Sequence, residues 1–160
     1  LAAVERAVAA CDVLIMAAAV ADYRPATVAE HKIKKTAAGG EQLALSLERT
    51  PDILGSLAGR DDFIKIGFAA ETDDLERYAR EKLARKNLDL IVANDARTAL
   101  GAADNAVTIY AAAGEPVTLA RQPKQAIAHG ILAALLQRWP APKSARPSGD
   151  GGRLSGMDHS

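Results

Sequence analysis

Residues 12–22 read D-V-L-I-M-A-A-A-V-A-D, and this stretch decides the fold. Its first five residues predict a buried β-strand, because apolar side chains follow one another without polar alternation, as in a sheet covered on both faces. Ala17 and Ala18 leave room for a ligand beyond the carboxyl end of this strand, where open α/β sheets usually bind ligands. Asp22 follows, and its carboxylate can accept hydrogen bonds from ribose hydroxyls or hold a metal-bound water.

Clustered lysines come shortly after this loop. Lys32, Ile33 and Lys34 alternate, so an extended chain projects both lysines to one side and Ile33 to the other, while Lys35 joins Ile33. A lysine is a mobile point charge that suits phosphate oxygens and offsets the charge that accumulates when these oxygens are attacked or leave. The order of strand, small-residue loop and lysines therefore suits a polyphosphate, although a lysine-rich loop is also commonly a solvated surface.

The rest of the chain alternates between helix and strand patterns. Helices are expected over residues 1–10, 50–59, 72–86 and 122–139, strands over 43–47, 63–68 and 89–93, and a hairpin over 107–119. Thr50 and Thr72 are good helix caps. Two α/β units in succession imply a parallel sheet. The predicted fold class is a Rossmann-like α/β fold: a three-layer parallel sheet with helices on both faces and an added β-hairpin.

The amino-acid composition limits the classes of function that this chain can have. The chain has 160 residues, 49% of them apolar, which is enough for one domain with a core over residues 1–139; the Pro-, Gly- and Ser-rich residues 140–160 predict a disordered tail. Twenty Lys and Arg balance twenty Asp and Glu, so no basic field favours nucleic acid. Cys11 is the only cysteine, which fits a reducing compartment, and no apolar run reaches membrane-spanning length. We expect a cytoplasmic protein.

Further features complete a candidate nucleotide site. A helix that begins at Pro51 presents the main-chain amides of Asp52, Ile53 and Leu54 to an anion. Phe68 ends a strand beside two alanines and offers a ring to a base, and Lys82 and Lys86 lie four residues apart on one side of a helix. Taken singly, each has an ordinary alternative: helix capping, core packing, or solvated charge at a helix carboxyl end.

The chain resembles the phosphopantothenoylcysteine synthetase family, which forms the carboxyl-terminal half of the bacterial bifunctional coenzyme A biosynthesis protein. The resemblance runs from about residue 1 to residue 139, and it rests on A-A-V-A-D-Y-R-P followed by K-I-K-K, on T-P-D-I at residues 50–53, on G-F-A-A-E-T at 67–72 and on D-L-I-V-A-N-D at 89–95. Two departures are Thr50 where the family has Asn, and Ala102 where the family has Phe. The resemblance implies that CTP contacts Ala17, Ala18, Asp22, Lys32, Pro51, Asp52, Ile53, Leu54, Phe68, Lys82 and Lys86.

The implied reaction joins 4'-phosphopantothenate to cysteine through an acyl cytidylate, with CTP as co-substrate, Mg²⁺ on its phosphates and Lys32 as the catalytic residue. Asn94 and Asp95 are second-rank candidates for substrate contact, and as turn formers they could equally be structural. The resemblance also implies a homodimer or higher homo-oligomer, with the hairpin or flap used for dimerisation. FMN would be needed only if a decarboxylase half precedes this chain, and we expect the chain to be a fragment because a strand normally precedes its first helix.

Two alternatives remain open at this point. Tyr78 and Lys82 have the Tyr-x-x-x-Lys spacing of an NAD(P)-dependent Rossmann reductase or epimerase, but the accompanying serine and a glycine-rich dinucleotide turn are missing from the sequence. The other alternative is a noncatalytic dimerisation module in which the lysine segment and the hairpin serve a partner chain.

Overall fold

The computed structural model describes residues 1–33, 43–99 and 101–139. The predictions for Lys34 and Lys35 and for the tail at residues 140–160 lie outside the described residues. The helices and strands, in chain order, are α1 (Ala2–Val8), β1 (Val13–Met16), β2 (Tyr23–Pro25), β3 (Leu47–Arg49), α2 (Ile53–Ser56), β4 (Ile64–Glu71), α3 (Leu75–Arg85), β5 (Leu90–Asp95), α4 (Ala96–Ala99), β6 (Asp104–Ala111), β7 (Val117–Pro123) and α5 (Lys124–Arg138).

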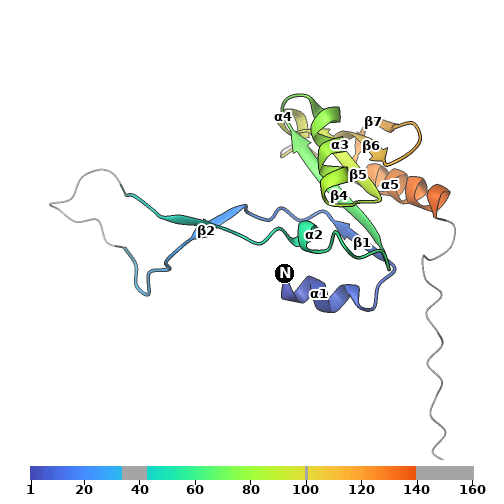
Figure 1. The fold of residues 1–160 in the computed structure, drawn as a ribbon. Helices are drawn as coiled ribbons and strands as arrows, with labels where there is room; N and C mark the ends of the chain where they lie inside the picture. The colour runs from blue at the N-terminus through green and yellow to red at the C-terminus, as the bar shows by residue number, and fades with distance from the viewer. Residues whose placement is uncertain (34–42, 100, 140–160) are drawn as a thin grey trace, which may run out of the picture.

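Five strands form the main sheet in the order β1-β4-β5-β6-β7 (Figure 1). The pairs β1–β4 and β4–β5 are parallel, whereas β5–β6 and β6–β7 are antiparallel. The predicted Rossmann-like α/β fold is confirmed, with one refinement: the expected hairpin is β6 and β7, and it continues the sheet as a mixed edge. A role for this hairpin in dimerisation stays a prediction.

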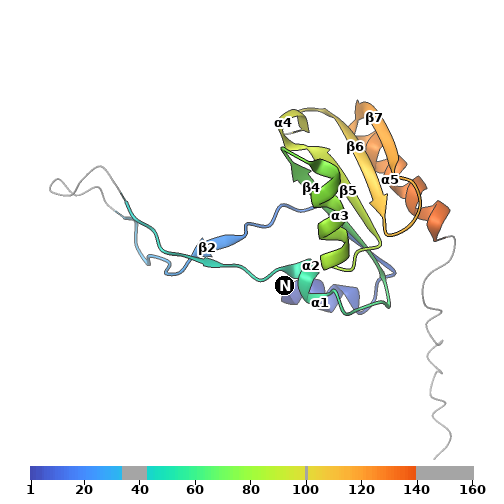
Figure 2. The ribbon, with the colours of Figure 1, turned by 45° about the horizontal axis from the view of Figure 1, so that its top comes forward.

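Helices cover both faces of the sheet, as predicted (Figure 2). Alternation along β4 explains this arrangement, because Ile64 and Ile66 point to one face while Ala69 points to the other. The first face packs on α5 through Ile127, Ile131, Ala134 and Leu135. The second face packs on α2 and α3 through Leu54, Ala79 and Leu83, and the adjoining cluster of Val8, Leu57 and Phe63 brings in α1.

Strand β1 is less buried than its sequence predicts. It lies at the end of the strand order, and in the described part of the chain no strand pairs with its outer edge. Ile15 is 43% exposed, whereas Ile66, its partner in the neighbouring strand, is fully buried. The expectation that β1 is covered on both faces is therefore wrong for the described residues.

Strands β2 and β3 form a separate two-stranded antiparallel ribbon that projects from the body of the domain, and we call the projecting segments 20–33 and 43–49 the arm (Figure 1). The strand expected over residues 43–47 forms only at its last residue, because pairing with β2 selects Leu47–Arg49. Thr50 closes the base of the arm: its main-chain N–H donates to Asp22 O at 2.9 Å, and its hydroxyl donates to Ala21 O.

Both predicted helix caps are wrong. Since Thr50 is bonded to the arm, α2 starts later, and Asp52 caps it by accepting a hydrogen bond from Gly55 N at 3.0 Å. Asp74, with φ of 43°, precedes α3 instead of Thr72, whose hydroxyl donates to Asp73. Among the described residues, no helix is both long and apolar enough to cross a membrane.

Candidate functional site

A cavity of about 1030 Å³ opens at the carboxyl ends of β1 and β4, between α2, α3 and the base of the arm. This is the edge of the sheet at which the sequence predicts a ligand. The cavity is lined by Met16, Ala17, Ala18, Ala19, Val20, Ala21, Asp22, Tyr23, Arg49, Thr50, Pro51, Asp52, Ile53, Leu54, Phe68, Ala70, Glu71, Tyr78, Glu81, Lys82, Arg85, Lys86 and Asn94.

The cavity brings together all but one of the residues predicted to contact the nucleotide. The exception is Lys32, which is exposed and belongs to the segment 26–33 on the arm beyond β2, so it does not line the cavity of its own chain (Figure 1). The sequence therefore predicts the contents of the cavity well, but a site formed by one chain alone does not include Lys32.

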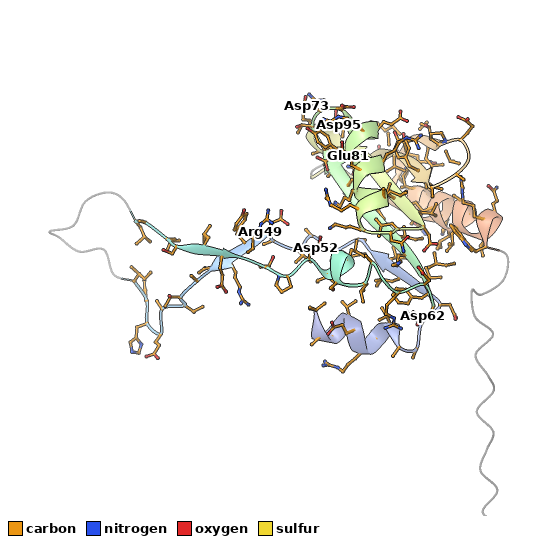
Figure 3. All side chains as sticks on the ribbon, viewed as in Figure 1. Arg49, Asp52, Asp62, Asp73, Glu81 and Asp95 are labelled. Carbon is orange, nitrogen blue, oxygen red and sulfur yellow. The ribbon has the colours of Figure 1, made fainter. Side chains whose placement is uncertain are left out.

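The two second-rank candidates for substrate contact, Asn94 and Asp95, lie in different places relative to the cavity. Asn94 lines the cavity, whereas Asp95 does not. Figure 3 shows Asp95 close to Asp73 at the far end of the domain from Asp52. The Asp95 carboxylate accepts hydrogen bonds from Arg97 N at 2.9 Å and from the Arg97 guanidinium, and the side-chain bond with Arg97 lowers the pKa of Asp95. Asp95 thus shapes the turn into α4, which is the structural alternative considered for it.

Lys82 is a half-buried cavity lysine that reaches from α3 to the end of β4. Its Nζ donates to Phe68 O at 2.9 Å, which joins α3 to the end of β4. Burial lowers the pKa of Lys82 below its ordinary value, and the nearby positive charge of Lys86 lowers it further, against an opposing effect of Glu71. The ammonium of Lys82 therefore lies next to the main chain of Phe68, where the cavity concentrates positive charge.

Lys86 and Asp52 form an ion pair across the cavity wall, with Lys86 Nζ 2.8 Å from Asp52 Oδ1. Burial raises the pKa of Asp52, but the hydrogen bonds from Lys86 and from Gly55 N outweigh this and leave the pKa lowered. The pair connects α3 to the start of α2. It also corrects the sequence interpretation, because part of the expected anion site at this helix start is already occupied by the Asp52 carboxylate, and α2 is only four residues long.

Several cavity residues were not predicted as site residues. Tyr23 and Arg49 lie directly opposite each other in the arm, and a hydrogen bond from Arg49 to Tyr23 raises the pKa of Arg49. Arg85 lies between Lys82 and Lys86 in the sequence and adds a further cation. Two signals could have found them: Arg49 directly precedes the Thr50-Pro51 pair, and Arg85 follows Lys82 by about one helical turn. The carboxylates of Glu71 and Glu81 complete the charged lining.

The described residues contain no group of three or more His, Cys, Asp or Glu side chains that could hold a metal ion. This does not conflict with magnesium on a nucleotide, because Mg²⁺ is usually bound by one or two carboxylates together with substrate phosphates. Asp22 is the carboxylate of the small-residue loop that faces the cavity.

The structure is an α/β domain with a cavity beyond the carboxyl ends of parallel strands, which is where such domains usually bind ligands. Residues 1–138 match the family described as the DNA/pantothenate metabolism flavoprotein C-terminal domain. The chain belongs to this family. The comparisons therefore favour the coenzyme A biosynthesis assignment, and they do not favour the reductase alternative.

Named relatives agree with this assignment. The chain is 44% identical over 126 residues to the coenzyme A biosynthesis bifunctional protein CoaBC of Vibrio parahaemolyticus, covering 76% of this chain and 31% of the relative. It is 52% identical over 105 residues to the CoaBC protein of Bacillus subtilis, covering 63% of this chain and 25% of that protein. The chain thus spans about a third or less of these relatives.

Solved structures show the same fold. The crystal structure of the C-terminal domain of CoaBC is 38% identical to this chain, with a TM-score of 0.67, and the match covers 86% of this chain and 59% of that one. A mutant of Cab2 in complex with phosphopantothenate-cysteine is 26% identical, with a TM-score of 0.60, and the match covers 79% of this chain and 43% of that one.

Proposed function

We propose that this chain is the CTP-binding part of a phosphopantothenate–cysteine ligase, acting in coenzyme A biosynthesis. The observation that carries the proposal is the cavity, which gathers Ala17, Ala18, Asp22, the segment 51–54, Phe68, Lys82 and Lys86 at one edge of the sheet. The names of the relatives and the complex of Cab2 with phosphopantothenate-cysteine support it. A location in the cytoplasm, the compartment expected from the sequence, is part of the same proposal.

The chemistry requires activation of a carboxylate. The free carboxylate of 4'-phosphopantothenate is too poor an electrophile for an amine, so its oxygen attacks the α-phosphorus of CTP, pyrophosphate leaves, and an acyl cytidylate forms. The amine of cysteine then attacks the acyl carbon and CMP leaves, which gives the amide. Lys82, Lys86 and Arg85 supply positive charge for the phosphates, and Phe68 supplies a ring beside the base.

Magnesium would be carried on the phosphates of the nucleotide, with Asp22 as the nearest candidate to hold a metal-bound water. When bound, Mg²⁺ would neutralise charge on the phosphate oxygens. The Asp22 carboxylate in the cavity lining fits such a role, because Mg²⁺ on a nucleotide usually takes one or two carboxylates together with the phosphates.

Lys32 requires a second copy of the chain under this proposal. It lies on the arm, away from the cavity of its own chain, and the arm carries exposed apolar side chains that include Tyr23, Val28 and Leu47. Exposed apolar surface of this kind commonly marks a contact with another protein. We propose a homodimer or higher oligomer in which the arm of one copy brings Lys32 to the cavity of its partner.

Three measurements test the proposal, all on the full protein encoded by the reading frame that contains this chain. Calorimetric titration should detect binding of CTP in the presence of Mg²⁺ and no binding of NADPH, and the reverse result would overturn the ligase assignment in favour of the reductase. Lys32→Gln should retain the fold and CTP binding but stop pyrophosphate release. Normal pyrophosphate release by this variant would remove Lys32 from the reaction, and light scattering of the same samples tests the dimer.

A further inference from the structure

Lys65, the second residue of β4, is almost completely buried, with 1% of its surface exposed. Its neighbours in the strand, Ile64 and Ile66, point to the α5 face, so the lysine points to the face that carries α2 and α3. A buried ammonium is expensive unless it is paired or hydrogen-bonded. An apolar side chain would avoid that cost, so the contacts of Lys65 deserve a functional explanation.

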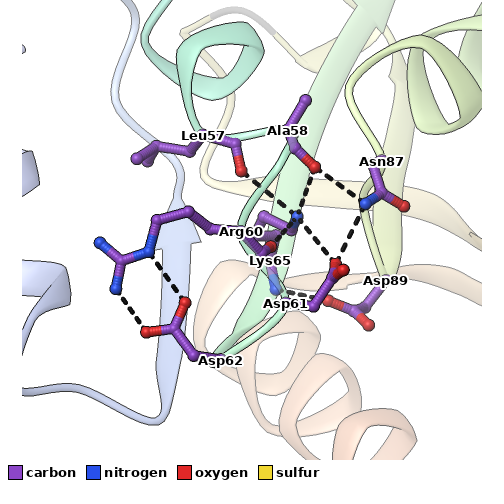
Figure 4. Close-up of polar contacts among 8 residues, drawn as sticks. All are labelled: Leu57, Ala58, Arg60, Asp61, Asp62, Lys65, Asn87 and Asp89. Atoms are coloured by element: carbon purple, nitrogen blue, oxygen red, sulfur yellow. Dashed lines mark hydrogen bonds and ion pairs between the residues drawn. The ribbon is translucent and has the colours of Figure 1, made fainter.

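The ammonium of Lys65 donates hydrogen bonds to main-chain carbonyls that follow α2 (Figure 4). Its Nζ donates to Leu57 O at 3.4 Å, to Ala58 O at 3.3 Å and to Arg60 O, and it lies 3.8 Å from the carboxylate of Asp61. These carbonyls belong to the C-cap Leu57 and to the turn that follows it, and a cation at the carboxyl end of a helix is favourable. Lys65 therefore holds the carboxyl end of α2 and the turn after it against the sheet.

The same turn is held from a second side by Asn87, which lies between α3 and β5. Its side-chain amide donates to Ala58 O at 2.8 Å and to Asp61 Oδ1 at 3.1 Å (Figure 4). The main chain of Lys65 is also fixed, since its N–H donates to Asp89 Oδ2 at 2.7 Å and its carbonyl accepts from Asp89 N at 2.9 Å. The lysine thus belongs to a rigid part of the sheet.

The other end of α2 forms part of the cavity wall. The segment 51–54 lines the cavity, and α2 has a single turn, so a displacement at its carboxyl end is transmitted directly to that wall. A helix this short is not stable on its own and depends on tertiary contacts for its position. Lys65 lies outside the cavity lining, so its side-chain bonds can affect the cavity through the position of α2.

We infer that Lys65 is a positioning residue: by binding the carbonyls after α2 it sets where the segment 51–54 stands in the nucleotide cavity. The inference rests on the proposed function, because it assigns Lys65 a role in CTP binding. The competing explanation is that Lys65 contributes only to stability. The two differ in what its removal does to CTP affinity in protein that remains folded.

The test is Lys65→Met, which keeps the length of the side chain and removes its donors. In the full protein, at a temperature where the variant is folded, the Kd and KM for CTP should rise about tenfold, while kcat at saturating CTP changes less. Hydrogen exchange should show faster exchange of the amides at residues 53–60 without nucleotide. The matched control is Ile66→Ala, which loses packing on the opposite, α5 face and should lower stability while leaving the Kd for CTP unchanged.

A milder variant keeps the inference testable if Lys65→Met does not fold. Asn87→Gly removes the second donor to Ala58 O but tolerates the positive φ of 47° at this position, and it should raise the Kd for CTP by a smaller factor. Unchanged CTP affinity in the folded variants, or an equal loss in Ile66→Ala, would overturn the inference. A wild-type protein that does not bind CTP would instead refute the proposed function, while the hydrogen-exchange result would still report whether Lys65 holds α2.

Discussion

Gly67 of β4 is the position where an added methyl group should reveal how closely α2 packs on the sheet. A Cβ atom at Gly67 would lie 2.6 Å from Leu88 Cδ1 and 3.4 Å from Leu54 Cδ1. Leu88 and Leu54 are only 4% and 6% exposed, so neither side chain can move into solvent to make room. We therefore predict that Gly67→Ala destabilises the protein.

The expected size follows from two opposing effects. Adding a methyl group to a packed core costs about 1–3 kcal/mol. Replacing glycine with alanine also reduces the freedom of the unfolded chain, which offsets about 0.4–1 kcal/mol of that cost. The free energy of unfolding should thus fall by about 1–2 kcal/mol, which raises the ratio of unfolded to folded protein by about 5- to 30-fold.

The assay is urea unfolding followed by circular dichroism, with the midpoint and the slope both fitted. Gly59→Ala is the matched control, because a Cβ atom there would meet no atom within 4 Å, and it should unfold at the wild-type midpoint or slightly above it. Leu88→Val in the Gly67→Ala background should cost less than Leu88→Val alone, since it relieves the contact. A Gly67→Ala protein that is as stable as Gly59→Ala would refute the reasoning.

Two further predictions concern pH. The lowered pKa of Asp52 means that the ionised carboxylate stabilises the folded state at pH values above the ordinary pKa of 3.8, and this stabilisation disappears as the pH falls through the lower pKa of the folded state. In urea unfolding at pH 7, Asp52→Asn should lower the free energy of unfolding by no more than about 1 kcal/mol, because the carboxylate is half exposed. At the acid end of a series of such measurements, the same variant should have no effect on stability. The lowered pKa of Lys82 means that its ammonium loses the proton at a pH below the ordinary pKa of 10.5. In calorimetry between pH 7 and 10, the affinity for CTP should therefore fall at a lower pH in the wild type than in Lys82→Arg. Identical pH profiles would show that Lys82 does not bind the phosphates as a cation.

The sequence predicts well what is decided by residues close together in the chain. A continuous apolar run identifies β5, the apolar and β-branched residues of F-I-K-I-G-F identify β4, and helical spacing identifies α3 and α5. The carboxyl-end rule for parallel strands then brings Ala17, Phe68 and Asn94 to one edge, where the cavity is found. No knowledge of side-chain packing is needed for these steps.

Long-range contacts explain what the sequence does not predict. Thr50 looks like a helix cap, but its hydroxyl bonds to Ala21 O, 29 positions earlier, and α2 is capped by Asp52 instead. Gly130 reads as a weak point in a helix, yet a Cβ atom there would lie 2.5 Å from Leu119 Cδ1, so the glycine lets α5 approach β7 closely. Neither partner could be identified from the neighbouring sequence.

The position of Lys32 outside the cavity of its own chain is not predicted by the sequence either, for another reason. Strand pairing in the arm carries the segment 26–33 outward, and nothing local in the lysine-rich pattern indicates that it leaves the cavity of its own chain. A lysine pattern predicts affinity for phosphate, but it does not predict where the lysine lies relative to a cavity. Under the proposed dimer, Lys32 would serve the cavity of the partner chain, and the sequence pattern alone could not specify this.

Strand β4 connects these observations, because residues close together in it contact both α2 and α3, the two helices that line the cavity. Lys65 holds the carboxyl end of α2, and Gly67 gives Leu54 of the same helix room to pack. Phe68 lines the cavity and packs against the core on the α5 face, its carbonyl accepts a hydrogen bond from Lys82, and Glu71 favours the charged form of Lys82. A change in register by one residue would exchange these faces and lose the contacts with both helices at once. The G-F-A-A-E-T segment is thus constrained by the geometry of the ligand site as well as by the core of the sheet.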